Sequence, residues 1–161
     1  MKIRLFDKDR DLETLCDMNY KLMQVHKAHS LMQFKFQKGR EGADEEVEAA
    51  LANGHIVLMV ETDLGKPIGM CAIDPRDIPG KVQVPDIHWL YVREDYRGRG
   101  VGTALIEAAV AKMKEEFPNA PGYCIGAEYW NEQAWKLYAK MGFKPQAIRL
   151  YYQAEGATYN D

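Results

Sequence analysis

The sequence lacks the features of a membrane-spanning, secreted or disulfide-rich protein. Its longest uninterrupted apolar run, residues 56–60, is far shorter than the ~20 residues needed to cross a bilayer. The first residues contain no apolar stretch of the kind found in signal peptides. The three cysteines, Cys16, Cys71 and Cys124, are too scattered for a disulfide framework and fit a reducing compartment. We therefore expect a cytoplasmic protein without a membrane partner.

The sequence also has little net charge and no visible internal repeat. It carries 21 basic and 24 acidic side chains, for a net charge of −3, so we expect no general attraction to nucleic acid. Its 161 residues, 47% of them hydrophobic, predict a single domain over 1–161 whose core needs no structural metal. His26 and His29 lie three residues apart, but no third ligand is near them in the sequence, so no metal site is predicted.

Hydrophobic patterning predicts a sheet that mixes antiparallel and parallel strands. Strand-like segments occur at residues 2–6, 55–61, 67–73, 82–92, 123–128 and 148–153. Helical segments are expected after a cap at Asp9 or Asp11, from 44 to 53, from 101 to 116, and from 131 to 141 with Gly142 as the end signal. Because a parallel pair needs a helical crossover, the long 101–116 helix indicates an α/β (α+β) protein.

The turn before the long helix carries the clearest functional signal. Gly98, Gly100 and Gly102 lead from the end of a strand directly into that helix. Glycine lets the backbone approach a ligand closely, and the N–H groups at a helix start favour an anion. Arg97 and Arg99 add positive charge and a fork geometry suited to phosphate. The turn is therefore predicted to bind a phosphate or pyrophosphate.

Two common phosphate-binding motifs do not fit this turn. The Rossmann fingerprint places its third glycine three residues after its second, and counted from Gly98 that position is Thr103. A P-loop needs Gly-Lys followed by Ser or Thr, but the Gly-Lys pairs at 65–66 and 80–81 are followed by other residues.

The pattern Arg97-x-x-Gly100-x-Gly102 after a strand resembles the acetyl-CoA signature of the GNAT N-acetyltransferase superfamily. Downstream, residues 131–143 (NEQAWKLYAKMGF) resemble the second conserved block of that family. The two blocks occur in the family's order and are separated by a helix and a strand. The resemblance covers roughly residues 80–150, and residues 1–80 fit the family's opening by pattern alone.

This resemblance implies the fold and the cofactor. The fold is a mixed α/β (α+β) sheet of about six to seven strands flanked by four helices. Two parallel strands splay apart at the cofactor site. The acyl donor is acetyl-CoA, and no metal takes part.

The resemblance also implies which residues hold the cofactor. Backbone N–H groups of the glycine turn hold the pyrophosphate of coenzyme A, and the pantetheine arm lies between the strands at 82–92 and 123–128. Leu90 and Val92 offer backbone groups to that arm, and Asn131 hydrogen-bonds it. The residues assigned to the pyrophosphate are Arg97, Gly98, Arg99, Gly100, Val101, Gly102 and Thr103.

Acetyl transfer to an amine needs an acid for the departing thiolate and a base for the attacking nitrogen. Tyr138 occupies the family's general-acid position, and a phenol with an ordinary pKa of about 10 stays protonated at neutral pH. Strand alternation places Asp86 and His88 on the face of Leu90, so we take His88 as the base, with Asp86 orienting it or relaying through water. Glu128 is the alternative base, and a further reading leaves the proton to solvent.

These assignments predict an N-acetyltransferase that moves an acetyl group from acetyl-CoA to a primary amine, a small molecule or a peptide, by direct attack in a ternary complex. No cysteine lies in either conserved block, so no cysteine nucleophile is implied. One alternative is an inactive acyl-CoA-binding sensor or interaction domain of the same fold. Another is an acyltransferase with a different acyl group or acceptor.

The acceptor is not specified by the sequence. The resemblance places acceptor loops at about 20–43 and 75–85, and the basic, aromatic segment 26–40 is either part of that entrance or a solvated loop. A homodimer is a further expectation. Its candidate contacts are the C-terminal aromatic residues Tyr151, Tyr152 and Tyr159.

Overall fold

The computed structural model describes residues 1–29, 38–147 and 149–150. In chain order, its elements are β1 (Lys2–Leu5), α1 (Lys8–His29), α2 (Gly39–Ala52), β2 (Ile56–Glu61), β3 (Pro67–Asp74), β4 (Asp86–Val92), the 3-10 turn η2 (Glu94–Tyr96), α3 (Val101–Glu116), β5 (Cys124–Ile125) and α4 (Glu132–Lys140). Within these residues, no helix combines the length and the apolar character that a membrane crossing requires.

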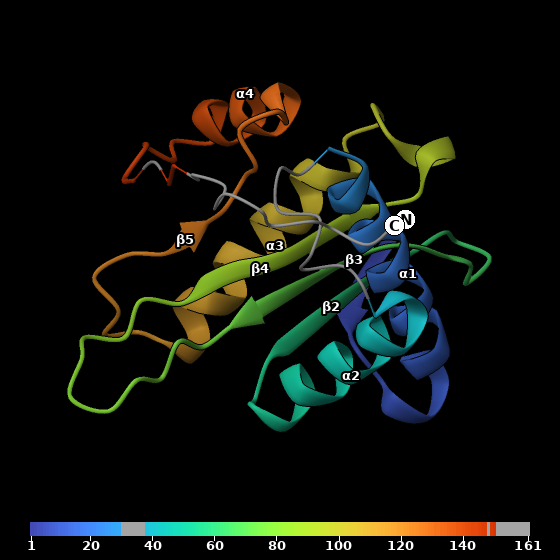
Figure 1. The fold of residues 1–161 in the computed structure, drawn as a ribbon, viewed down its shortest axis with the longest axis horizontal. Coiled ribbons are helices and arrows are strands. Elements are labelled where there is room, and N and C mark those ends of the chain that lie inside the picture. Colours follow the sequence, from blue (N-terminus) through green and yellow to red (C-terminus); the bar gives the residue numbers. More distant parts are fainter. Residues whose placement is uncertain (30–37, 148, 151–161) are drawn as a thin grey trace, which may run out of the picture.

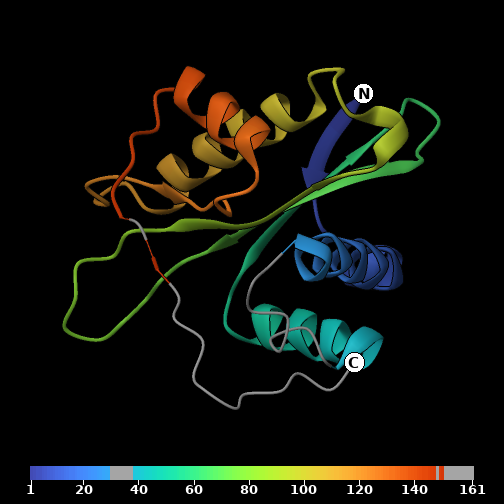
Figure 2. The ribbon, with the colours of Figure 1, turned by 45° about the horizontal axis from the view of Figure 1, so that its top comes forward.

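The strands form one mixed sheet in the order β1-β2-β3-β4-β5. Neighbouring strands are antiparallel except β4 and β5, which run parallel on either side of the α3 crossover. Helices α1 and α2 cover one face of the sheet, and α3 and α4 cover the other (Figures 1 and 2). The predicted α/β class, its parallel pair and its four helices are confirmed.

The described part of the chain contains five strands, fewer than the six to seven expected. Strand 123–128 is reduced to Cys124–Ile125, and Gly126, which follows directly, is of a residue type that weakens a strand. The final strand, expected at 148–153, falls largely outside the described residues. Tyr151, Tyr152 and Tyr159 also lie outside them.

Two hydrophobic cores follow from alternation along the central strands. On one face, Met59 and Met70 pack against α1 and α2, together with Leu15 of α1. On the other face, residues such as Cys71 pack against α3, where Leu105 is fully buried. Both faces of the central strands are therefore covered, which explains why β2 and β3 read as continuous apolar runs.

The strand β4 contains a β-bulge that alternation does not predict. Trp89 pairs with Ala72, whereas Ile87 pairs with the next residue of β3, Ile73. His88 is therefore an extra residue without a partner in the ladder. The bulge places Trp89 in the core under α1 and α2, while Ile87 stays in the core under α3.

The bulge overturns the expectation that Asp86, His88, Leu90 and Val92 share one face. Leu90 and Val92 pack toward α3, as Ile87 does. Because neighbours in a strand point to opposite faces, Asp86 lies on the side of α1 and α2. One inserted residue therefore separates Asp86 from the face of Leu90 and Val92.

Two helix starts differ from the sequence prediction. The helix α1 begins at Lys8, and its cap is Asp7, whose Oδ1 accepts a bond from the Asp9 N–H (3.1 Å). Asp11, one of the predicted caps, is instead buried in an ion pair with Arg4 (2.6 Å). The helix α2 begins at Gly39, five residues before the acidic residues expected to open it, and ends at Asn53 as predicted.

Candidate active site

The glycine turn joins β4 to α3 in a conformation that needs glycine. Gly98 has φ +70° and Gly100 has φ +80°, both in the left-handed region where a side chain is strained. Gly100 is the N-cap of α3 and offers no side chain to cap it. The first bond of the helix runs from the Ala104 N–H to the Gly100 carbonyl (3.0 Å). The N–H groups of the residues just before Ala104 therefore take no part in the backbone bonds of the helix and can bind an anion.

The two arginines of the turn are held differently. Arg97 donates from Nε to the carbonyl of Val92 (3.0 Å), which fixes its guanidinium at the end of β4. Arg99 is exposed and lies over the ring of Tyr96, 5.5 Å from its centroid. Val101, assigned to the pyrophosphate, is buried in the core, so only its backbone N–H is suited to that contact.

The edge of β4 beside this turn is open. The strand β5 pairs with the start of β4 only, and the last pair is Ile87 with Ile125. Among the described residues, no strand pairs with residues 88–92 on that side. The predicted splay of the two parallel strands is thus present. It leaves backbone groups of β4 available to an extended ligand arm, as in strand addition.

A cavity of about 710 Å³ lies along this open edge. Its walls come from the end of α1, from β4, from Arg97 and from the start of α4. The cavity brings together five residues that the sequence analysis assigned to the cofactor or to catalysis, Leu90, Val92, Arg97, Asn131 and Tyr138.

Helix α4 presents Tyr138 to the cavity. The side chain is half-buried, and its ring packs edge-on against Phe143 at 6.3 Å between centroids. Burial raises the pKa of Tyr138 to about 12. The hydroxyl therefore stays protonated at neutral pH and can donate a proton to a leaving group in the cavity.

Asn131 stands at the N-terminus of α4. Its Oδ1 accepts a bond from the Ala134 N–H (3.2 Å), so Asn131 is the N-cap of the helix. This bond fixes the orientation of the side-chain amide at the wall of the cavity. The other end of the helix is closed by Gly142 with φ +91°, as predicted.

An aromatic cluster from the end of α1 and Trp130 lines one wall of the cavity, and Glu128 lies beside it. The ring of His29 stacks on Trp130 at 4.4 Å between centroids, and His26 meets the same ring edge-on at 6.0 Å. Nδ1 of His26 lies 3.9 Å from a carboxylate oxygen of Glu128. Burial lowers the pKa of His26, although Glu128 acts in the opposite direction. The start of the 26–40 segment thus lines the cavity through His26 and His29, and its residues 30–37 are outside the described chain.

His88 and Asp86 are not among the described residues that line the cavity. Nδ1 of His88 lies 3.0 Å from Nε2 of His55, and its ring stacks on Trp89. Asp86 instead pairs with Arg76 at 2.7 Å. The structure therefore gives His88 an orienting partner, but that partner is His55 and not Asp86.

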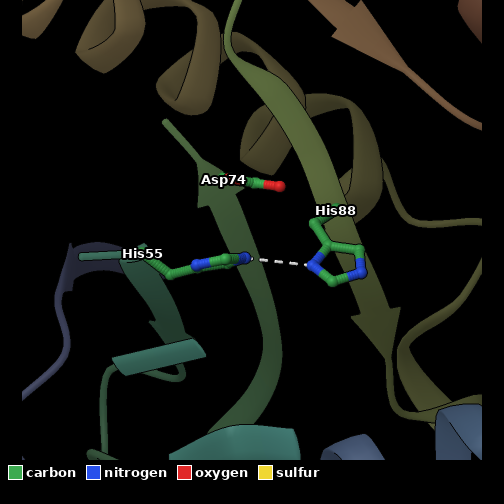
Figure 3. A group of neighbouring side chains, drawn as sticks. All are labelled: His55, Asp74 and His88. Atoms are coloured by element: carbon green, nitrogen blue, oxygen red, sulfur yellow. Dashed lines mark hydrogen bonds between the residues drawn. The ribbon is translucent and has the colours of Figure 1, made fainter. Parts of the chain in front are cut away.

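Sequence reasoning missed His55 and Asp74, which lie with His88 in one cluster (Figure 3). Ligand atoms of the three side chains all lie within 4.8 Å of one another. His55 directly precedes β2, Asp74 is the last residue of β3, and His88 is the bulge residue of β4. Their spacing along the chain is irregular, so only the strand order reveals the cluster.

Comparison with known proteins gives the family. Residues 24–143 match the model of the Acetyltransferase (GNAT) family. An uncharacterised N-acetyltransferase of Methanocaldococcus jannaschii is 36% identical over 86 residues, which are 52% of this chain and 37% of that protein. An N-alpha-acetyltransferase of Sulfurisphaera tokodaii is 35% identical over 81 residues, 50% of this chain and 48% of that protein. The chain thus spans half or less of the length of these curated relatives.

A solved structure supports the same fold. A GCN5-related N-acetyltransferase from Ralstonia eutropha superposes with a TM-score of 0.71 over 94% of this chain and 97% of that one, at 23% identity. The family model covers both the open edge of β4 and the Tyr138 helix. The chain belongs to the acetyltransferase (GNAT) family.

Proposed function

We propose that this protein transfers an acetyl group from acetyl-CoA to a primary amine by direct attack in a ternary complex. The observation that carries the proposal is the cavity along the open edge of β4. Its lining includes Arg97 beside the glycine turn and Tyr138, whose pKa is raised by burial to about 12. A thioester on an extended arm fits this arrangement, with its phosphates at the turn and its sulfur near Tyr138.

The transfer needs two proton movements. The amine nitrogen attacks the thioester carbonyl, a C–N bond forms and the C–S bond breaks. The nitrogen loses one proton to a base, and the departing thiolate of coenzyme A takes one from the hydroxyl of Tyr138. A phenol that ionises only near pH 12 keeps this proton available at every physiological pH.

The role of Tyr138 is tested by Tyr138→Phe, which keeps the ring in contact with Phe143 and removes only the hydroxyl. General acids contribute about 10²–10⁴-fold to the rate, so kcat should fall by at least about 100-fold. The Kd for acetyl-CoA, measured by calorimetry, should stay within a factor of two to three. Turnover equal to that of the unmodified protein would show that Tyr138 is a packing residue.

We assign the base to His88, acting through water. His88 is exposed, and its Nδ1 lies 3.0 Å from Nε2 of His55. When Nδ1 of His88 donates to His55, Nε2 of His88 keeps its lone pair and can accept a proton. Asp86 is bound to Arg76 and takes part only through solvent. Glu128, whose carboxylate lies 3.9 Å from Nδ1 of His26 in the cavity wall, is the competing candidate.

The pH dependence of kcat/KM separates the two candidates. His88→Gln should abolish the acidic limb of the profile, whereas Glu128→Gln should leave that limb in place. The reverse result would assign the base to Glu128. An acidic limb that survives in both variants would mean that solvent accepts the proton directly.

The first acceptor class to test is the α-amine of peptides. One relative of this chain is named N-alpha-acetyltransferase, and Glu128, beside His26 of the cavity wall, offers a carboxylate for an ammonium group. Release of coenzyme A thiol, together with the mass of the acetylated product, should be followed with peptides, polyamines, aminoglycosides and arylalkylamines. If the protein binds acetyl-CoA but releases no thiol with any of these acceptor classes, it is an acyl-CoA-binding domain and not an enzyme.

A further inference from the structure

In the cluster of His55, Asp74 and His88, both histidine rings lie against Trp89, which packs in the core under α1 and α2. None of the three residues is in the described lining of the 710 Å³ cavity. Two imidazoles and one carboxylate converge in this cluster from three strand segments that lie side by side in the sheet (Figure 3). We propose that these three side chains form a binding site for a divalent transition-metal ion such as Zn²⁺.

The three ligand atoms are near enough to one another to share such an ion. Zinc bonds to nitrogen and oxygen are about 2.0–2.2 Å long, so tetrahedral ligand atoms lie about 3.3–3.6 Å apart. The His55 Nε2 to His88 Nδ1 distance is 3.0 Å, and all ligand atoms lie within 4.8 Å. The two nitrogens are thus slightly closer than two ligands of one zinc ion, so the contact between them must lengthen when an ion binds both.

The donor set selects the kind of metal. Two imidazole nitrogens and one carboxylate oxygen suit zinc, cobalt, nickel or copper, whereas Mg²⁺ and Ca²⁺ prefer oxygen ligands alone. Three protein ligands leave a fourth position for water, as in open zinc sites. The ring of His88 is held by its stack on Trp89, with 5.2 Å between centroids, so one of the two nitrogen ligands is already oriented.

The charge around the cluster also favours a cation. Asp74 and Asp86 face each other across β3 and β4, and one carboxylate oxygen of Asp86 is buried without a hydrogen-bond partner among the described residues. Arg76 binds both acids, at 3.1 Å and 2.7 Å, and supplies one positive charge against their two negative ones. The two acids and Arg76 together therefore carry a net negative charge while both histidines are neutral.

Metal binding has a consequence for catalysis that rests on the proposed function. A metal on Nδ1 of His88 requires the proton of the neutral ring to sit on Nε2. That nitrogen then cannot accept a proton from the attacking amine. An occupied site should therefore slow acetyl transfer without weakening acetyl-CoA binding.

The test is a calorimetric titration of Zn²⁺ into the tag-free, chelator-treated full chain, with no acetyl-CoA or amine present. We expect saturable binding of one ion per chain. His55→Gln and His88→Gln should each weaken the affinity at least tenfold. Far-UV circular dichroism without metal verifies that both variants remain folded. Because no acyl transfer is measured, the outcome is independent of the proposed function.

Two control variants exclude other ligands. His26→Gln/His29→Gln removes the other two histidines of the chain, and Cys124→Ser removes the exposed thiol, whose residue pairs with Asp86 in the sheet. Both controls should bind Zn²⁺ as the unmodified protein does. Absence of saturable binding, unchanged affinity in His55→Gln, or loss of binding in either control would overturn the proposal.

Discussion

Replacing Gly100 can separate the cost of backbone strain from the loss of ligand binding, because a second glycine offers a matched control. It has φ +80°, and a Cβ built on it would meet no atom within 4 Å. Gly54, which follows the end of α2, has φ +79° and equally open surroundings. Replacing either glycine with alanine therefore adds the same left-handed strain without a clash. Only Gly100 belongs to the turn that we assign to the pyrophosphate.

The expected magnitudes follow from these two positions. Left-handed strain costs about 1–2 kcal/mol, so Gly100→Ala and Gly54→Ala should each lower Tm by about 2–8 °C. A methyl group that displaces one charge-assisted bond to phosphate costs about 1.5–3 kcal/mol more, or roughly 10–150-fold in Kd. Calorimetry with coenzyme A should show this loss for Gly100→Ala alone. Equal affinity in both variants would refute the assignment of the turn.

Four further predictions concern stability and the cation site. Arg4 holds the buried Asp11 through two bonds, of 2.6 and 2.9 Å, so Arg4→Met should lower the unfolding free energy by about 3 kcal/mol in urea titrations. The bonds from Arg4 lower the pKa of Asp11, so their contribution to the free energy of unfolding should be lost as the pH falls below about 4. Arg4→Met should not show this loss. Burial raises the pKa of Tyr138 to about 12, so stability should decline as the pH rises from about 10 through 12, and a smaller decline is expected in Tyr138→Phe. Arg76→Gln releases Asp74 and removes a positive charge, so it should bind Zn²⁺ about tenfold more tightly, whereas weaker binding would contradict the assigned ligands.

Much of the fold is predictable because it rests on local signals. Gly142 and Asn53 end their helices where the sequence indicates, and the parallel strand pair follows from the long crossover helix. The start of α1 is mispredicted, because Asp7, Asp9 and Asp11 are equally good caps by residue type. Only the ion pair of Asp11 with Arg4, across two elements, decides which acid is buried.

The residues assigned to acetyl-CoA and to the general acid are also predictable from the sequence, whereas the partners of the proposed base, His88, are not. Gly98 and Gly100 reveal their backbone geometry through residue type, and Tyr138 follows a recognisable block. The partners of His88 depend on a bulge, and no residue type marks it. His55 reaches the cluster only because β2 and β4 flank the same strand, β3.

The bulge therefore determines what His88 can do. Its Nδ1 faces Nε2 of His55, and only one of these two nitrogens carries the shared proton in the neutral pair. When His55 donates, Nε2 of His88 is protonated and cannot serve as a base. When His88 donates, Nε2 has a lone pair and can accept the proton of an amine. His55 is thus a positioning residue for the proposed base, and a metal between the two rings would hold His88 in the inactive tautomer. The same side chain is suited to catalysis and to metal binding, but not to both at once.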